Sequence, residues 1–86
     1  MNQTDVIKYP LSTEKSIRLL EAENKLVFVV DMKATKKEIK EAVEQMFKIK
    51  TLKVNVSIAA HAEKRAYVKL APEFPAIDIA TELGLM

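Results

Sequence analysis

The sequence predicts an α+β fold in the order β-α-β-α-β-β-α, with helices packed mainly on one face of a four-stranded antiparallel sheet. Two neighbouring segments, 51–59 and 64–71, alternate apolar and polar residues as the strands of a half-buried hairpin do. Segment 25–31 is apolar without alternation, which is typical of a central strand covered on both faces. Segment 35–47 combines a capping box with an apolar stripe at helical spacing. The two amphipathic strands need a helical layer over one face only.

The chain is predicted to begin with a short strand and a helix. The segment "DVIKY" favours a strand, which Pro10 ends because proline cannot donate to a ladder and disfavours helix at the residue before it. Ser12 or Thr13 then offers an N-cap, and Glu14 suits a first helical turn. The helix is expected to run to about Glu23 and to stop at Asn24. Its buried side should consist of Ile17 and Leu20, with Leu19 at the edge.

The second helix has the clearest pattern in the chain. Thr35 and Glu38 fit a capping box at its start. Its apolar stripe is expected to consist of Ile39, Ala42, Val43, Met46 and Phe47. Two i,i+4 ion pairs can form on its solvent side, Lys37 with Glu41 and Lys40 with Glu44.

The hairpin strands are predicted to divide their side chains between two faces. The inward set is Leu52, Val54, Val56, Ile58, Ala66, Val68 and Leu70. The outward set, on a face left open, is Lys53, Asn55, Ser57, Arg65, Tyr67 and Lys69. The connection "AAHAE" has no glycine, so a tight two-residue primed turn is not expected.

A last helix is predicted after "PEF". Pro75 fits its first position, and Gly84 fits its C-terminal stop. Its apolar side is expected to consist of Ile77, Ala80 and Leu83, with Ile79 beside them.

Length and composition limit the classes of protein to consider. The 86 residues suffice for one domain, expected to span residues 1–86. The absence of cysteine excludes a disulfide framework and a Cys-based zinc site, and favours a reducing compartment such as the cytoplasm. The opening "MNQTDVIKYP" lacks the pattern of a signal peptide, and the longest apolar run, "LVFVV", is too short to span a bilayer. We therefore expect no membrane association.

Positive charge is concentrated in the middle of the chain. Residues 33–70 carry ten basic and four acidic groups, a balance of +6, whereas residues 1–32 carry −1 and residues 71–86 carry −3. This distribution indicates a polyanion partner met by one patch. The alternative is a solvated surface that only keeps the protein soluble.

The sequence offers little for catalysis, and we predict no catalytic residue, no metal site, no cofactor and no small-molecule substrate. His61 is the only histidine, and no spacing places a nucleophile or carboxylate beside it, so a solvated loop histidine is the simpler interpretation. A tetrahedral metal site would need several ligands. The helical carboxylates indicate a solvated charged face rather than an acid–base pair. They are Glu38, Glu41 and Glu44.

The open sheet face is the stronger functional signal, because cations and an aromatic ring on a sheet can meet phosphates and stack bases. Segment 64–70 loosely resembles the basic-aromatic strand of an RNA-recognition motif. It lacks the glycine, however, and Tyr67 is the only aromatic residue where two or three are expected. Recognition of structured RNA through its backbone fits better. The alternative is that the cations on this face only keep it soluble.

A second basic cluster lies at the predicted start of the second helix. Its members are Lys33, Lys36 and Lys37. Backbone N–H groups and the helix dipole also favour phosphate there. A solvated helix start is the alternative interpretation.

Several segments that cover nearly the whole chain carry a family resemblance. They are "VIKYPLSTEKS", "NKLVFVVD", "ATKKEIKEAVEQMF", "KVNV" and "EKRAYVKLAPEFPAIDI". The most specific parts are the "YP..TEK" opening and the signature from Lys64 to Leu70, followed after a spacer by Ile79. In these segments the chain resembles the large-subunit ribosomal protein L23 family, in the short form of its archaeal branch.

The resemblance implies the fold predicted above and a structural role in binding large-subunit ribosomal RNA beside the mouth of the polypeptide exit tunnel. It also implies a neighbour of the L29 family and a share in the platform where factors such as signal recognition particle meet the emerging chain. From the family come Lys8, Tyr9, Thr13, Lys15, Lys36, Asn55, Lys64, Arg65 and Lys69. The open face and the helix start add Lys33, Lys37, Lys53, Ser57 and Tyr67. Together these residues are the candidate RNA-binding set.

Two departures from the family pattern affect the hairpin. The family usually has threonine where this chain has Val56, on the predicted core side. It usually has glycine where this chain has Ala62, so a residue that tolerates positive φ is lost at the hairpin tip.

Two other classes of function stay open. A protein-interaction module without an RNA partner would use exposed apolar residues near Phe74 or in the C-terminal "LGLM". An enzyme would have to depend on His61.

Overall fold

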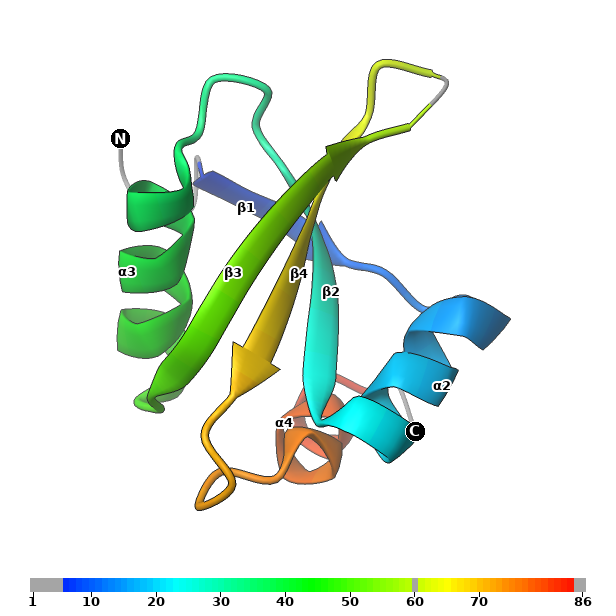
Figure 1. Ribbon diagram of the computed structural model, residues 1–86, viewed down its shortest axis with the longest axis vertical. Helices are drawn as coiled ribbons and strands as arrows, with labels where there is room; N and C mark the ends of the chain where they lie inside the picture. Colours follow the sequence, from blue (N-terminus) through cyan, green and yellow to red (C-terminus); the bar gives the residue numbers. More distant parts are fainter. Residues whose placement is uncertain (1–5, 60, 85–86) are drawn as a thin grey trace.

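The computed structural model describes residues 6–59 and 61–84 (Figure 1). The strands are β1 (Ile7–Pro10), β2 (Lys25–Val30), β3 (Thr51–Ile58) and β4 (Lys64–Leu70). The helices are α2 (Glu14–Glu23), α3 (Lys36–Phe47) and α4 (Ala76–Glu82). The strands form one antiparallel sheet in the order β1-β2-β4-β3. The predicted fold class and element order are therefore confirmed; Asp5, predicted to open the first strand, lies outside the described residues.

One face of the sheet is packed against the helices. The strands contribute Leu26, Phe28 and Val30 from β2 and Ala66, Val68 and Leu70 from β4. The helices contribute Ile39, Ala42 and Val43 from α3 and Ala76, Ile79 and Ala80 from α4. The rings of Phe28 and Phe47 stack with centroids 5.9 Å apart. Figure 1 shows α3 beside β3 at one edge of this layer, and α4 near α2 at the other end.

The central strand β2 is buried on both faces, as its unbroken apolar run predicts. Leu26, Phe28 and Val30 enter the helix-packed core. Val27 and Val29 point to the opposite face, yet they are only 4% and 3% exposed. Val27 is covered there by residues of the β1–α2 connection and of α2, including Leu11 and Leu19. The sheet face opposite the core is therefore closed at β2 and open at β3 and β4.

Both longer helices begin with a capping box. Thr13 is the N-cap of α2 and exchanges hydrogen bonds with Ser16, which takes the place of the usual glutamate. Thr35 and Glu38 form the predicted box at α3. These boxes satisfy backbone N–H groups that a helix start would otherwise leave free.

Asn24 does more than end α2. Its backbone is in the left-handed region with φ 56°, as expected for a C-cap. Its side-chain oxygen accepts from the Ala76 N–H at 2.6 Å. Its side-chain nitrogen lies 3.3–3.4 Å from three carbonyl oxygens that share its two N–H groups, those of Leu70 at the end of β4 and of Ala71 and Phe74 in the β4–α4 connection. One side chain thus joins the end of α2 to the start of α4.

The predicted inward set of β3 is wrong for one residue at each end, although the register breaks only at Leu52. The pairing with β4 shifts between Thr51 and Lys53, which leaves Leu52 in a bulge and 58% exposed. Thr51 takes the buried place opposite Leu70 instead. Ile58, at the turn end of the strand, is 61% exposed. The inward positions of β3 are therefore Thr51, Val54 and the half-buried Val56.

Two helical residues predicted to be in the core are also exposed. Met46, in the last turn of α3, is 41% exposed, and the buried stripe consists of Ile39, Ala42 and Val43 with Phe47 packed against it. Ile77 in α4 is 45% exposed. The helix begins one residue later than predicted, with Pro75 as N-cap, and its buried face consists of positions i, i+3 and i+4 from Ala76, which leaves Ile77 outside it.

Strand β3 ends at Ile58 and β4 begins at Lys64, so the connection is longer than a two-residue turn, as expected. The Ala59 N–H donates to the Glu63 carbonyl at 2.8 Å, and the Ala62 N–H donates to the Ala59 carbonyl at 3.0 Å. Ala62 has φ 56°, in the left-handed region where the methyl group of alanine is disfavoured. Glycine at this position would be free of that strain.

Candidate nucleic-acid interface

The register of the sheet arranges the open face in three rows of side chains that run across the strands. The first row is Tyr9, Val29, Arg65 and Ser57. The second row is Leu11, Val27, Tyr67 and Asn55, where the Leu11 N–H donates to the Val27 carbonyl at 2.9 Å. The third row is Lys25, Lys69 and Lys53. The open face is the name used below for these three rows.

The two faces of β4 are cleanly separated. Its core residues are at most 1% exposed; they are Ala66, Val68 and Leu70. Lys69 is exposed, and Arg65 and Tyr67 are half-buried on the other side. The sidedness predicted for this strand is therefore confirmed.

The third row places three ammonium groups directly across neighbouring strands. Lys53 and Lys69 are exposed, and Lys25 is half-buried. Like charges at paired positions destabilise a sheet. The one ion pair that the described residues give this row joins Lys25 Nζ to Glu23 Oε1 at 3.1 Å. This lysine row is therefore the part of the open face with the greatest excess of positive charge.

The other end of the open face carries its own counter-ion. Arg65 Nε donates to Glu63 Oε2 at 2.8 Å, and the Tyr9 hydroxyl donates to Glu63 Oε1 at 3.0 Å. The hydrogen bond from Arg65, and next the one from Tyr9, lowers the pKa of Glu63. The same bonds raise the pKa of Arg65 and that of Tyr9. This Glu63 cluster of Tyr9, Glu63 and Arg65 ties edge strand β1 to β4.

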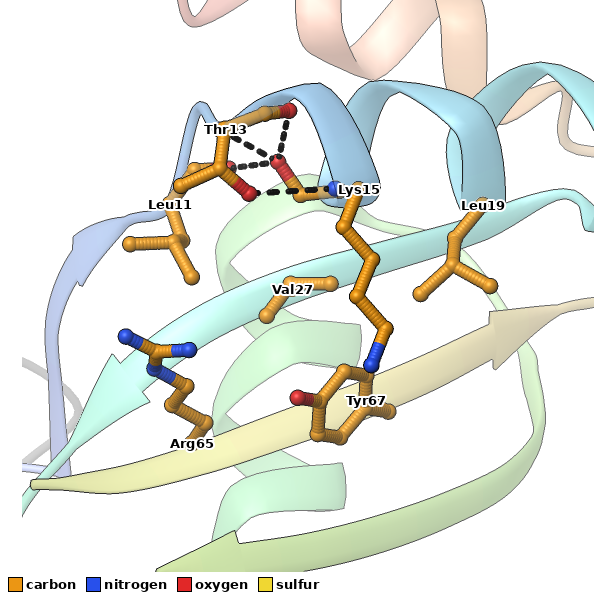
Figure 2. A pocket seen from close by; sticks show the side chains of 8 residues that line it. Leu11, Thr13, Lys15, Leu19, Val27, Arg65 and Tyr67 are labelled. Carbon is orange, nitrogen blue, oxygen red and sulfur yellow. Dashed lines mark hydrogen bonds between the residues drawn. The ribbon is translucent and has the colours of Figure 1, made fainter. Parts of the chain in front are cut away.

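Between these two ends lies a hollow beneath the first turn of α2 (Figure 2). Its floor is Val27 and Tyr67, neighbours in the second row. Figure 2 shows the Lys15 side chain reaching down from α2 to the ring of Tyr67, with Arg65 on the side of the Tyr67 hydroxyl. The hollow therefore combines an aromatic ring with two cations.

The structure brings most of the candidate residues together, but not all of them. Lys8 is exposed on β1, next to Tyr9, and Thr13 caps α2. The second basic cluster lies away from the open face, because α3 packs on the core side. Its members are Lys33, Lys36 and Lys37. The hydrogen bonds from Thr35 lower the pKa of Glu38, whose carboxylate already serves the N–H group at that helix start.

Lys64 also points away from the open face. It is paired with Val30 and Ile58 and shares the core side of β4. Its ammonium group donates to the Ala34 carbonyl at 2.6 Å and to the Met32 carbonyl at 3.4 Å. These hydrogen bonds link the β2–α3 connection to β4.

Two residues of the open face were missed by sequence reasoning. Lys25 opens an apolar strand whose lack of alternation hides which side it faces. Glu63 lies in the turn "AAHAE", where no periodicity assigns a direction. Glu63 precedes Arg65, Tyr67 and Lys69 at steps of two residues. Strand alternation could therefore have placed Glu63 on the same face as these three residues.

The residues on which the other two classes of function would depend lie in several places. The described residues contain no group of three or more His, Cys, Asp or Glu side chains able to hold a metal ion. His61 is exposed in the turn. Phe74 is packed against the core, Ile77 near it is 45% exposed, and Leu85 and Met86 of "LGLM" lie outside the described residues. Within the described part of the chain, no helix is long and apolar enough to span a bilayer.

These features define a small α+β protein whose sheet has one helix-packed face and a second, cation-bearing face that is covered at β2 and open at β3 and β4. The family model for ribosomal protein L23 matches residues 5–77, from before β1 into α4. The chain therefore belongs to the ribosomal protein L23 family, a family of structural proteins of the large ribosomal subunit. The resemblance to this family noted in the sequence is confirmed.

Proposed function

We propose that this protein binds large-subunit ribosomal RNA through its open face, as a structural component of the cytoplasmic ribosome near the mouth of the polypeptide exit tunnel. The observation that carries the proposal is the lysine row. Three ammonium groups at paired positions are unfavourable in the free protein, and phosphates placed along them would remove the repulsion. Family membership supports RNA as the polyanion.

The candidate contacts divide by position. Lys53, Lys69 and Lys25 would meet phosphates at one end, and Lys15 and Arg65 would do so near the hollow. Asn55 and Ser57 on β3 can donate to phosphate or ribose oxygens. Lys8 and Tyr9 extend the same surface over β1. The lysines at the α3 start lie on another side of the molecule, and the Lys64 ammonium already donates to the carbonyls of Ala34 and Met32, so these residues are the weaker candidates.

The assembly context follows from the family alone. A neighbour of the L29 family and docking factors such as signal recognition particle would meet surfaces that RNA leaves free. Co-sedimentation of the chain with large ribosomal subunits through a wash of moderate salt tests this context. Recovery of the chain only in the unbound fraction would count against it.

The direct test measures binding to an isolated large-subunit RNA transcript across salt. Each phosphate contact adds about 0.9 to the slope of log affinity against log salt, which is about fivefold in affinity at 0.15 M salt. The double change Lys53→Glu with Lys69→Glu should therefore weaken binding by about 30-fold or more and lower the slope by about two. Thermal unfolding should show that the variant is folded, since both side chains are exposed.

A control with the same charge change identifies the surface. The double change Lys36→Glu with Lys37→Glu alters two exposed lysines on the core side of the sheet. It should cost clearly less affinity than the open-face variant. Equal losses would move part of the interface to the start of α3, and unchanged affinity in the open-face variant would refute the proposal.

A further inference from the structure

We infer that two copies of this protein pair through the free edge of β3, so that their sheets join into one continuous antiparallel sheet. The free edge is the row of backbone N–H and C=O groups of β3 that point away from β4, its one neighbour in the sheet. The inference does not depend on the proposed function, because it concerns the edge of the sheet and needs no RNA.

The hydrogen bonds of the hairpin show which residues form the free edge. Successive residues of an antiparallel strand direct their backbone groups alternately toward one neighbour and away from it. The Ala59 N–H donates to the Glu63 carbonyl at 2.8 Å, and steps of two along the register put the odd-numbered residues of β3 from Lys53 on in the same set, facing β4. The even-numbered residues therefore direct their N–H and C=O groups to the free edge. They are Val54, Val56 and Ile58.

The two edge strands of the sheet differ in how well they are protected against further pairing. β1 has four residues, a register irregularity between Ile7 and Tyr9, and Pro10 at its end. Short length, bulges and proline are the features by which proteins block sheet edges. β3 has eight residues and one charged side chain, that of Lys53. Since only β3 is open to pairing, two copies form a closed dimer rather than a filament.

One antiparallel register of β3 against itself fits the strand. It places Val56 opposite Val56 of the second copy, and Val54 opposite Ile58 at both ends of the paired segment. This is the longest register that keeps the bulge at Leu52 out of the pairing, where it would disrupt the ladder. It also places an apolar neighbour beside Ile58, which is 61% exposed in the single chain.

The same register keeps positive charges apart. On the open face, Asn55 lies opposite Ser57 of the second copy, and the amide and the hydroxyl can hydrogen-bond to each other. Lys53 lies opposite Ala59 of the second copy. The two Lys53 side chains are then about 20 Å apart along the strands, which exceeds the Debye length of about 8 Å at physiological ionic strength. The dimer therefore forms without placing like charges opposite one another.

The first test is sedimentation equilibrium of the chain without RNA. The average mass of the wild type should rise with concentration from 9.7 kDa toward twice that value and no further. Ile58→Pro should stay monomeric, because proline removes an N–H group that points to the free edge and leaves the bonds to β4 intact. Ile58→Val is the matched control, since it keeps the N–H group and should associate as the wild type does. A wild type that stays at 9.7 kDa at millimolar concentration overturns the inference, and so does association of Ile58→Pro equal to that of the wild type.

Two charge variants test the register, and they decide the question even if Ile58→Pro is poorly folded. One is Asn55→Lys with Ser57→Lys, and the other is Asn55→Glu with Ser57→Glu; both residues lie on the open face, outside the core. Each variant alone should dimerise about 2- to 30-fold more weakly than the wild type, the range that two cross-strand pairs span. An equimolar mixture should form heterodimers at least as tightly as the wild type dimerises. A mixture that associates no better than either variant alone contradicts the pairing of Asn55 with Ser57 and with it the inference.

Discussion

The two ends of the open face differ in how far their cations are paired with counter-ions. At one end, Arg65 is held by Glu63, which also accepts from Tyr9. At the other end, Lys25, Lys53 and Lys69 face one another across three strands with one ion pair, from Lys25 to Glu23. The first arrangement stabilises the free protein and the second opposes it. Cations that lack counter-ions in the free protein indicate an anionic partner more clearly than cations that are already paired.

The largest expected effect comes from removing the uncompensated end. The triple change Lys25→Gln, Lys53→Gln and Lys69→Gln should weaken binding to the RNA transcript by about two orders of magnitude at 0.15 M salt. It should also raise the free energy of unfolding at low salt, because repulsion across the strands is relieved. Arg65→Gln, at the compensated end, should weaken binding by about fivefold or less and lower stability. Salt titrations of RNA binding and denaturant unfolding of both variants test the difference between the two ends. Equal changes of the same sign in the free energy of unfolding would contradict that difference.

A medium effect is expected at the turn next to Glu63. The change Ala62→Gly removes a methyl group from a residue at φ 56° and should raise the free energy of unfolding by about 1 kcal/mol. The melting temperature should then rise by roughly 4–8 °C. RNA affinity should not change, because the turn lies at the end of the open face where charge is already compensated. A loss of affinity in the stabilised variant would show that the strained turn belongs to the interface.

The smallest effect concerns the pH dependence of stability. The pKa of Glu63 in the folded protein lies below the ordinary value of 4.5, because Arg65 and then Tyr9 donate to its carboxylate. Its contribution to stability is therefore complete above about pH 4.5 and is lost as the pH falls through the lowered pKa. Glu63→Gln should show a shallower fall in melting temperature between pH 5 and about pH 3 than the wild type does. Parallel curves would mean that Glu63 is not coupled to folding.

Local pattern was enough for most of the fold. Thr35 with Glu38, the alternation from Arg65 to Leu70 and the unbroken run of β2 each depend on neighbours in the chain, so each could be predicted. The bulge at Leu52 could not, because it depends on how Thr51 pairs with Leu70 and on Glu44, which accepts from both the Thr51 N–H and its hydroxyl at 2.9 Å and 3.2 Å.

The candidate site was predictable in part for the same reason. Alternation alone placed Lys53, Tyr67 and Lys69 on the open face. The lysine row needs the register of β2 against β4 to bring in Lys25, and the hollow needs α2 to lie over the sheet beside Tyr67. Both features depend on tertiary structure, which the periodicity of a single segment does not predict. Lys64 shows the converse, since a family position that suggests RNA contact is occupied with backbone carbonyls of its own chain.

The side-chain hydrogen bonds of Asn24 affect the order in which this protein can fold during its synthesis. Its partners lie 46 to 52 residues further along the chain. At about 5–20 residues per second, translation needs roughly 3–10 s after Asn24 has been added before Ala76 follows. Until then the end of α2 has only its local cap. A nascent chain of this protein should therefore remain open to chaperones and proteases until Ala76 has been made.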